Sequence, residues 1–231
     1  DPVTEYHIYR DGEQVGSVPA GTLVYKDETV EKGVTYKYTV VAVNGDGEGL
    51  FSTPELALRA NGVPEQPATM TAVATGATSA TVTWSAPVEQ NANTKLPGTG
   101  GYQPDGTTAL TVLRYQVKWV NQSNGNVGSI ELPVAFSGGY YVPADSSGAP
   151  VEMVENKYTL GLNPTAADSQ KQYFTFDPSN EQYTYTVRNL AQGSGYELSV
   201  AAINEVGTGA VQTRPATTWN TPGRPGELKI A

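Results

Sequence analysis

One short pattern decides the fold of this chain, and the chain contains it twice. The first copy is YKYTVVAVN at Tyr36–Asn44, and the second is YELSVAAIN at Tyr196–Asn204. In both copies, aromatic or aliphatic side chains alternate with polar or small ones, which is typical of a β-strand with one buried face. The repeat extends at the same spacing, since Val30 matches Leu190 and Gly-rich turns follow both copies. The chain therefore contains one type of β-module twice.

Further runs in which apolar and polar residues alternate precede each copy. Glu5–Ile8 lies upstream of the first copy, and Ala80–Trp84 and Arg114–Val117 lie upstream of the second. Gly, Pro, Asn and Asp separate the runs, as they separate the strands of β-sandwiches and barrels. No stretch keeps a helical period of apolar residues. The sequence predicts an all-β fold.

This order of elements resembles the fibronectin type III family, whose modules are immunoglobulin-like β-sandwiches. The resemblance implies that the tyrosines at the turn from strand E to strand F bond their hydroxyls to nearby backbone. It also implies a structural core, which consists of Trp84 in strand B, Tyr6 and Tyr115 in strand C, and Tyr36, Leu190 and Tyr196 around that turn. We therefore expect tandem immunoglobulin-like (fibronectin type III) β-sandwiches.

The two copies predict unequal domains. Residues 1–61 match only strands C to G, so we interpret them as the C-terminal part of one module. Residues 62–218 are interpreted as a complete module, and residues 219–231 as a linker with the first strand of a following module. On this interpretation the sequence is a window from a longer array. The alternative is a short protein whose missing strands come from a neighbouring chain.

The second module exceeds the roughly 100 residues that such a sandwich needs. The surplus falls into insertions near 88–112 and 122–183. The latter contains strand-like runs at 130–132, 140–142, 158–160 and 173–176. Structureless loops beyond about 12–15 residues are uncommon in compact domains, so we expect extra strands that extend a sheet or pack across its face. We further expect this insertion to be dispensable for folding and to form a small core of its own.

Aromatic residues in that insertion are the candidates for contact with a ligand or partner. Tyr140, Tyr141, Tyr173 and Phe174 lie outside the seven-strand framework. Flat aromatic side chains suit sugar stacking and protein contacts alike. The alternative is that these four residues only fill the core of the insertion.

Composition excludes several classes of function. The chain has 231 residues, a net charge of −9, no cysteine and a single histidine, His7. The acidic balance argues against nucleic acid as a partner, and no apolar run is long enough for a membrane helix. Without cysteine there is no thiol nucleophile, disulfide or cysteine metal site. We predict no catalytic residue, no cofactor and no metal site.

Three local motifs are candidate sites. His7 lies between inward-pointing neighbours, so we expect it to face solvent as a cross-strand neighbour rather than to act as a base. Asn44–Gly49 does not match the spacing of a calcium loop, and its counterpart in the second copy lacks the Asp. Asn121 opens an N-glycosylation triplet, which makes it a possible site of modification.

These observations favour a non-enzymatic structural or adhesive region of a larger extracellular or cell-surface protein. Such a region would act as a spacer and contact other modules, neighbouring chains, glycans or a surface protein. The alternative is an accessory region, spacer or carbohydrate-contacting, of a secreted polysaccharide-degrading enzyme. An intracellular filament protein is a third possibility. Fold alone does not decide among them.

Overall fold

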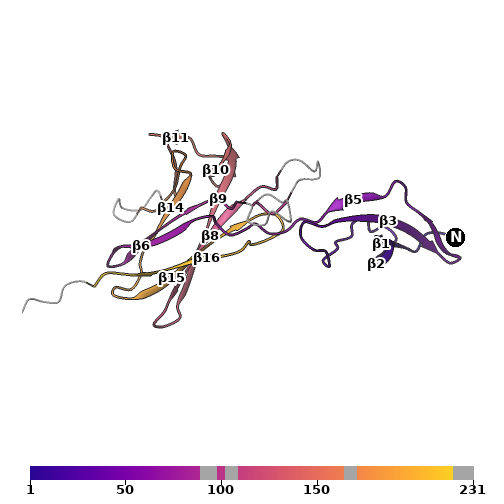
Figure 1. Cartoon of the computed structure of the whole chain (residues 1–231), viewed down its shortest axis with the longest axis horizontal. Helices are drawn as coiled ribbons and strands as arrows, with labels where there is room; N and C mark the ends of the chain where they lie inside the picture. Colours follow the sequence, from indigo (N-terminus) through magenta and orange to yellow (C-terminus); the bar gives the residue numbers. More distant parts are fainter. Residues whose placement is uncertain (89–97, 102–108, 164–170, 221–231) are drawn as a thin grey trace, which may run out of the picture. The chain divides into compact units, whose positions relative to one another are not determined.

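The computed structural model describes residues 1–88, 98–101, 109–163 and 171–220. These residues form β-strands, β1 to β16, joined by turns and connections (Figure 1). They contain no helix long and apolar enough to cross a membrane. The chain divides into two compact units. Unit 1 contains Asp1–Gly62, and unit 2 contains most of the chain from Val63 onward.

Much of the expected insertion near 88–112 and nearly all of the expected linker at 219–231 lie outside the described residues.

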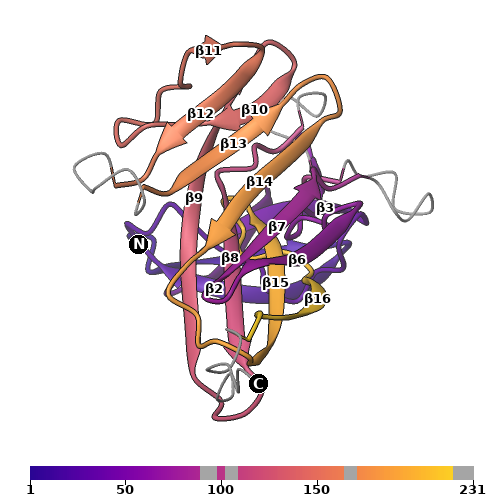
Figure 2. The same cartoon turned by 90° about the vertical axis from the view of Figure 1, so that its left-hand side faces the viewer.

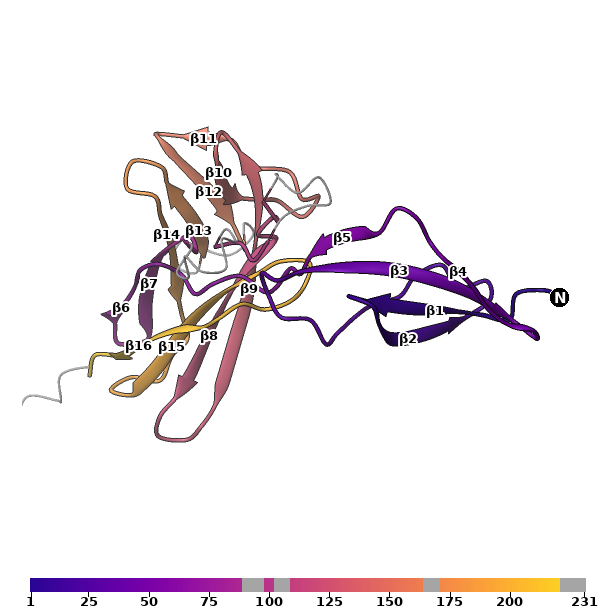
Figure 3. The same ribbon diagram turned by 45° about the vertical axis from the view of Figure 1, so that its right-hand side comes forward.

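Unit 1 is a single antiparallel sheet (Figure 3). Its central strand is β3, which carries the first copy of the repeated pattern. The strands lie in the order β2-β1-β3-β4, and β5 also pairs with β3. Their bounds are β1 (Glu5–Arg10), β2 (Glu13–Pro19), β3 (Thr35–Asn44), β4 (Gly47–Phe51) and β5 (Leu56–Arg59).

The connection between β2 and β3 lies against one face of this sheet, which we call the inner face of unit 1. Tyr25 donates a hydrogen bond to the carbonyl of Val15 over 2.7 Å, and Asp27 accepts one each from Arg10 and Tyr38. Burial opposes the charge on Asp27. Hydrogen bonds from Thr29, Tyr38 and Arg10 outweigh that effect and lower the pKa of Asp27 to about 2. The connection is therefore held at its Asp27 end by an ion pair.

Unit 2 consists of two antiparallel sheets (Figure 2). One contains the second copy of the repeated pattern on its strand β15, next to β8. In spatial order its strands are β10 (Tyr140–Pro143), β9 (Val127–Ser137), β8 (Arg114–Asn121), β15 (Gly195–Ile203) and β16 (Gln212–Thr217).

The other sheet is built around the expected strand B, which is β7. In spatial order its strands are β11 (Met153–Val154), β12 (Lys157–Gly161), β13 (Tyr173–Asp177), β14 (Gln182–Val187), β7 (Ser79–Ser85) and β6 (Met70–Gly76). Inward residues of both sheets form one continuous core. The expected all-β sandwich is confirmed.

Trp84 on β7 lies at the centre of this core and is fully buried. Its ring packs edge-on against Tyr115, with centroids 5.5 Å apart, and parallel to Tyr183 at 5.6 Å and Phe174 at 5.9 Å. These partners come from both sheets, so the two sheets share this aromatic cluster.

The long insertion forms strands where the sequence predicted them, but its expected separate core is wrong. Val142, Phe174 and Phe176 belong to the same buried cluster as Trp84. The reason is the pairing of the added strands. β10 pairs with β9, and β13 pairs with β14, so the insertion widens both sheets and its inward residues extend one interior.

Candidate contact surfaces

The two tyrosines of the repeated pattern have the predicted role. In unit 2, the Tyr196 hydroxyl accepts a hydrogen bond from the backbone N–H of Ala191 over 2.8 Å. In unit 1, the Tyr36 hydroxyl accepts one from the backbone N–H of Glu31 over 3.0 Å. Both bonds reach back along the chain by the same number of residues. These hydroxyls are structural and take no part in a contact site.

Asn121 opens the glycosylation triplet noted in the sequence. It is the last residue of β8 and is almost fully buried. Its Nδ2 donates to the Tyr196 hydroxyl over 3.1 Å, and its Oδ1 accepts from the backbone N–H of Ser123 over 2.9 Å. A glycan on Nδ2 would need space that the fold has already filled. The fold thus engages both ends of the Asn121 amide, and its glycosylation stays a prediction.

An open cavity in unit 2, the aromatic hollow, collects aromatic side chains from the two sheets. Its volume is about 400 Å³. Tyr140 and Tyr141 of β10 line it, together with Phe176 of β13 and Tyr183 of β14. The remaining lining residues are Ser85, Ala86, Val88, Gly139 and Glu181.

Two hydroxyls around the hollow are already engaged by backbone. Tyr183 donates to the carbonyl of Tyr141, and Tyr141 donates to the carbonyl of Leu110 over 3.2 Å. Burial raises the pKa of both phenols, so both remain protonated donors. The rings form a chain, since Phe176 lies 5.4 Å from Tyr140 and 4.7 Å from Tyr183 between centroids. The aromatic rings of the hollow are therefore held by contacts with one another and by two hydrogen bonds to backbone.

Glu181 gives the hollow a polar edge. It is exposed and precedes β14, and its carboxylate is the one charged group in the lining that the structure describes. A hollow with aromatic walls and few polar groups has the composition of a small ligand site. Such a surface suits a sugar ring or a side chain of a partner protein.

The four aromatic residues expected to contact a ligand or partner lie in three different environments. Tyr140 and Tyr141 line the hollow, whereas Tyr173 is 48% exposed on β13 and does not line it. Phe174 is fully buried and stacks on Trp84, so it cannot present its ring to a ligand. Tyr173 and Phe174 point to opposite faces because successive residues of a strand alternate.

Sequence reasoning named only Tyr140 and Tyr141 in the hollow and missed its other lining residues, including Phe176, Glu181 and Tyr183. The alternation in β13 and β14 indicates that Phe176 and Tyr183 point inward. No local signal shows that β10 approaches these two strands, because that approach depends on pairing between distant segments. For Glu181, the sequence indicates only that the residue lies in a turn, and nothing in it predicts a place beside aromatic side chains.

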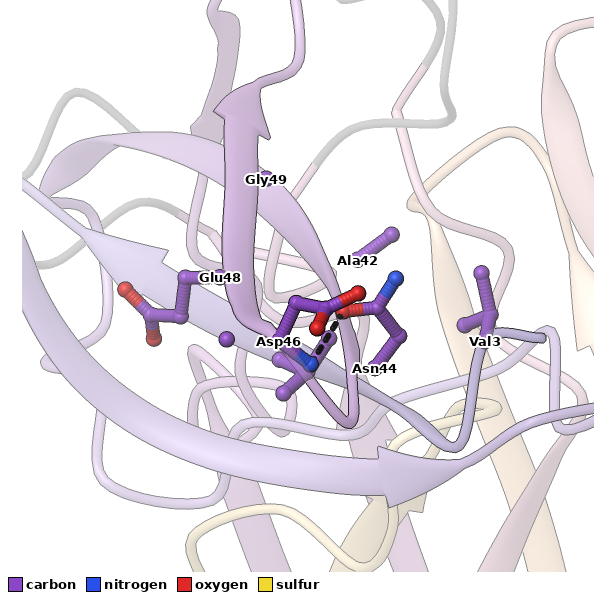
Figure 4. Close-up of a pocket in the computed structure, with 8 residues that line it drawn as sticks. Val3, Ala42, Asn44, Asp46, Glu48 and Gly49 are labelled. Atoms are coloured by element: carbon purple, nitrogen blue, oxygen red, sulfur yellow. Dashed lines mark hydrogen bonds between the residues drawn. The ribbon is translucent and has the colours of Figure 1, made fainter. Parts of the chain in front are cut away.

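A smaller hollow of about 290 Å³ lies at the loop between β3 and β4 in unit 1 (Figure 4). Asn44 Oδ1 accepts from the backbone N–H of Asp46 over 3.0 Å, which closes the turn. Glu48 points away from both residues and accepts from the Tyr9 hydroxyl over 2.8 Å. Within the part of the chain that the structure describes, no three acidic or histidine residues gather as metal ligands.

His7 lies on the outer face of the unit 1 sheet, opposite the inner face, between Glu5 of its own strand and Glu48 of β4. Its Nδ1 is hydrogen-bonded to Glu48, and its Nε2 lies 3.4 Å from Glu5. The bond to Glu48 raises the pKa of His7, and the bond from His7 lowers the pKa of Glu48. This arrangement stabilises a surface ion pair.

The comparisons with known proteins find similar solved structures. A chicken structure described as CNTN1 FN1-FN3 domains shares 16% identity with a TM-score of 0.36, covering 94% of this chain and 56% of that one. The fn3 domain of the human collagen alpha-1(XX) chain shares 14% sequence identity with a TM-score of 0.37. The match covers 73% of this chain and 97% of that one. A two-domain fibronectin type III segment of chicken tenascin shares 12% sequence identity with a TM-score of 0.36. The match covers 94% of this chain and 86% of that one.

This chain spans little more than half of the CNTN1 structure. No protein-family model matches the sequence, and no curated protein matches it. At these identities and TM-scores the similarities carry no inference about function. The chain is an all-β protein that is similar to solved fibronectin type III structures.

Proposed function

We propose that this chain is a non-enzymatic structural region of a larger extracellular or cell-surface protein. Its β-units act as spacers, and unit 2 carries a surface that contacts a protein or a glycan. The observation that supports this proposal is the aromatic hollow, which lies on a framework of two sheets around one buried core. Binding residues held by a rigid scaffold are a common arrangement.

Tyr140 carries most of the proposed contact. Its ring is only partly buried, and it packs against Phe176, which fixes its orientation. A fixed aromatic side chain contributes contact area with little loss of conformational entropy on binding. Glu181 adds an acceptor for hydroxyl or ammonium groups.

The test screens the 1–231 protein against arrays of defined oligosaccharides and of short basic, neutral and acidic peptides. We expect saturable binding to at least one class, and a loss of about tenfold in affinity, roughly 1.4 kcal/mol, in Tyr140→Ala. Glu181→Gln should weaken binding of a hydroxyl-rich or cationic ligand.

Tyr173→Ala is the matched control, because Tyr173 is an exposed tyrosine of the same insertion outside the hollow. Equal losses in Tyr140→Ala and Tyr173→Ala would contradict a contact at the hollow. Binding confined to plant or microbial polysaccharides would favour the accessory region of a polysaccharide-degrading enzyme instead.

A further inference from the structure

The aromatic hollow of unit 2 carries a negative charge at its edge. Among the lining residues that the structure describes, Glu181 is the one ionised side chain, and none is a lysine or an arginine. Burial raises the pKa of Tyr183 and the charge of Glu181 raises it further, so this carboxylate acts electrostatically on the wall of the hollow. The net charge of the whole chain, −9, has the same sign. The hollow therefore favours a cation over an anion.

Aromatic side chains provide the walls of the hollow. Tyr140 and Tyr141 are half-buried, so part of each ring is accessible, whereas Phe176 and Tyr183 are almost fully buried. Contact with Phe176, at 5.4 Å between ring centroids, holds the ring of Tyr140. The face of an aromatic ring attracts a cation because the ring quadrupole makes that face negative. Accessible aromatic surface beside a carboxylate thus suits an organic cation.

The hydrogen-bonding groups of the lining are largely engaged already. Ser85 Oγ accepts from the backbone N–H of Thr69 over 3.0 Å and lies 2.9 Å from the Thr69 hydroxyl. Tyr141 and Tyr183 donate their hydroxyls to backbone carbonyls. A sugar ring or a primary ammonium carries several donors, and each of them needs an acceptor. A quaternary ammonium has no N–H donor and presents methyl groups instead, so it matches this lining best.

The size and charge of the hollow also restrict what is attached to the cation. A volume of about 400 Å³ is in the range of small-ligand sites. A phosphate or carboxylate on a short stem would lie close to Glu181 and would be repelled by it. The stem next to the ammonium should therefore be uncharged.

We propose that the aromatic hollow binds a quaternary ammonium group on an uncharged stem, as in the side chain of trimethylated lysine. The methyl groups contact the accessible parts of Tyr140 and Tyr141, and Glu181 provides the opposite charge. We rest this assignment on the proposed function, because it names the group that the partner presents to the same hollow. The partner is then a protein, and not a glycan or lipid that carries phosphocholine.

The probe is choline chloride, titrated at constant ionic strength into isotope-labelled 1–231 protein and followed by backbone amide shifts. Two matched ligands accompany it. One is the neutral isostere of choline in which carbon replaces the nitrogen, and the other is ethanolamine, a primary ammonium. We expect saturable shifts at Tyr140, Tyr141 and Glu181 with choline, and affinities at least about tenfold lower for the two matched ligands.

Substitutions of the hollow separate the ring from the charge. Tyr140→Leu keeps an apolar side chain and removes the aromatic face, so it should weaken choline binding about tenfold, whereas Tyr140→Phe should bind choline like the parent. Glu181→Gln removes the charge and should weaken choline binding about fivefold, with no matching loss for the neutral isostere.

Two further variants are matched controls. Glu155→Gln removes the same charge from the exposed turn between β11 and β12, and Tyr173→Leu removes an exposed ring outside the hollow. Both should keep the parental affinity for choline. The dispersion of the amide shifts shows whether each variant is folded. If Tyr140→Leu does not fold, the neutral isostere and Glu181→Gln decide the outcome.

The source of the cation is tested by competition. A short peptide that contains trimethyllysine should displace choline, and the same peptide with unmodified lysine should not. Tighter binding of phosphocholine than of choline would overturn the uncharged stem and indicate a phosphocholine-bearing partner instead. Equal affinities for choline and its neutral isostere would show that the hollow selects apolar shape alone, and would overturn the proposal as well.

Absence of saturable choline binding would also overturn this assignment, and the array screen then separates it from the proposed function. An arrayed glycan or peptide whose binding depends on Tyr140 would leave the proposed function standing without the quaternary ammonium. If neither choline nor any arrayed compound binds, both are wrong.

Discussion

Trp84 contacts three other rings in the interior of unit 2, and its indole N–H is buried without a hydrogen-bond partner. We predict that Trp84→Ala lowers the free energy of unfolding of unit 2 by about 3–5 kcal/mol, because it leaves a cavity. Trp84→Phe should cost less, since it keeps the stacking and removes the unpaired N–H. Chemical denaturation followed by circular dichroism measures both.

Trp219 is the control for this prediction. It is 57% exposed, so Trp219→Ala removes little buried surface and should change the free energy of unfolding far less. Similar losses for Trp84→Ala and Trp219→Ala would show that Trp84 is not the centre of the core.

The ion pair of His7 and Glu48 predicts a pH dependence in unit 1. Because the bond to Glu48 raises the pKa of His7, the pair contributes stability below the ordinary histidine pKa and loses it as the pH rises through the raised value. Because the bond from His7 lowers the pKa of Glu48, the contribution also disappears in strong acid. An NMR titration should place the His7 pKa above 6.5.

Glu48→Gln should return the His7 pKa toward its ordinary value. Glu31→Gln is the control, because Glu31 makes no described contact with His7. An unchanged His7 pKa in Glu48→Gln would mean that Glu48 is not the partner in solution.

At the scale of elements, the insertion is part of the sandwich and not an appendage. β9 pairs along β8, and β13 pairs along β14, and both added strands contribute buried residues. We predict that deletion of 125–182 prevents unit 2 from folding, because it removes Leu132, Val134, Phe174 and Phe176 from the core. Loss of chemical-shift dispersion for unit 2 would be the readout.

A shorter deletion tests the same element without touching the core. Residues 145–155 connect β10 with β12 and contain the short edge strand β11, whose Met153 and Val154 are exposed. Replacing 145–155 with a Gly-Ser turn should preserve the fold. A folded protein after the long deletion would restore the appendage interpretation.

At the scale of the whole molecule, the units differ in how much of each sheet is covered. Unit 2 has two facing sheets around a continuous core, while unit 1 has one sheet with an exposed inner face. We predict that amides of β1 and β3 exchange faster than those of β8 and β15, since local stability follows buried apolar contact. Hydrogen exchange with mass spectrometry checks this, and equal protection in the two units would contradict it.

Much of the fold could be read from alternation and from the repeat. Tyr36–Asn44 and Tyr196–Asn204 indicated paired β-modules, and the strand-like runs at 130–132, 140–142, 158–160 and 173–176 all lie in strands. Alternation also placed Trp84 among inward residues. These features are local, because the side chains of a strand point to alternate faces whatever lies opposite.

Only the tertiary structure decided what each face meets. Phe174 is buried because β13 joins β14 in the sheet that carries Trp84, and Asn121 is buried because β8 ends beside Tyr196. The aromatic hollow exists because β10 approaches β13 and β14, which are distant in sequence. The exposure of Val40 and the burial of Val200 differ although the two residues match in type and pattern. Local pattern assigns a residue to a face, and long-range pairing decides whether another layer covers that face.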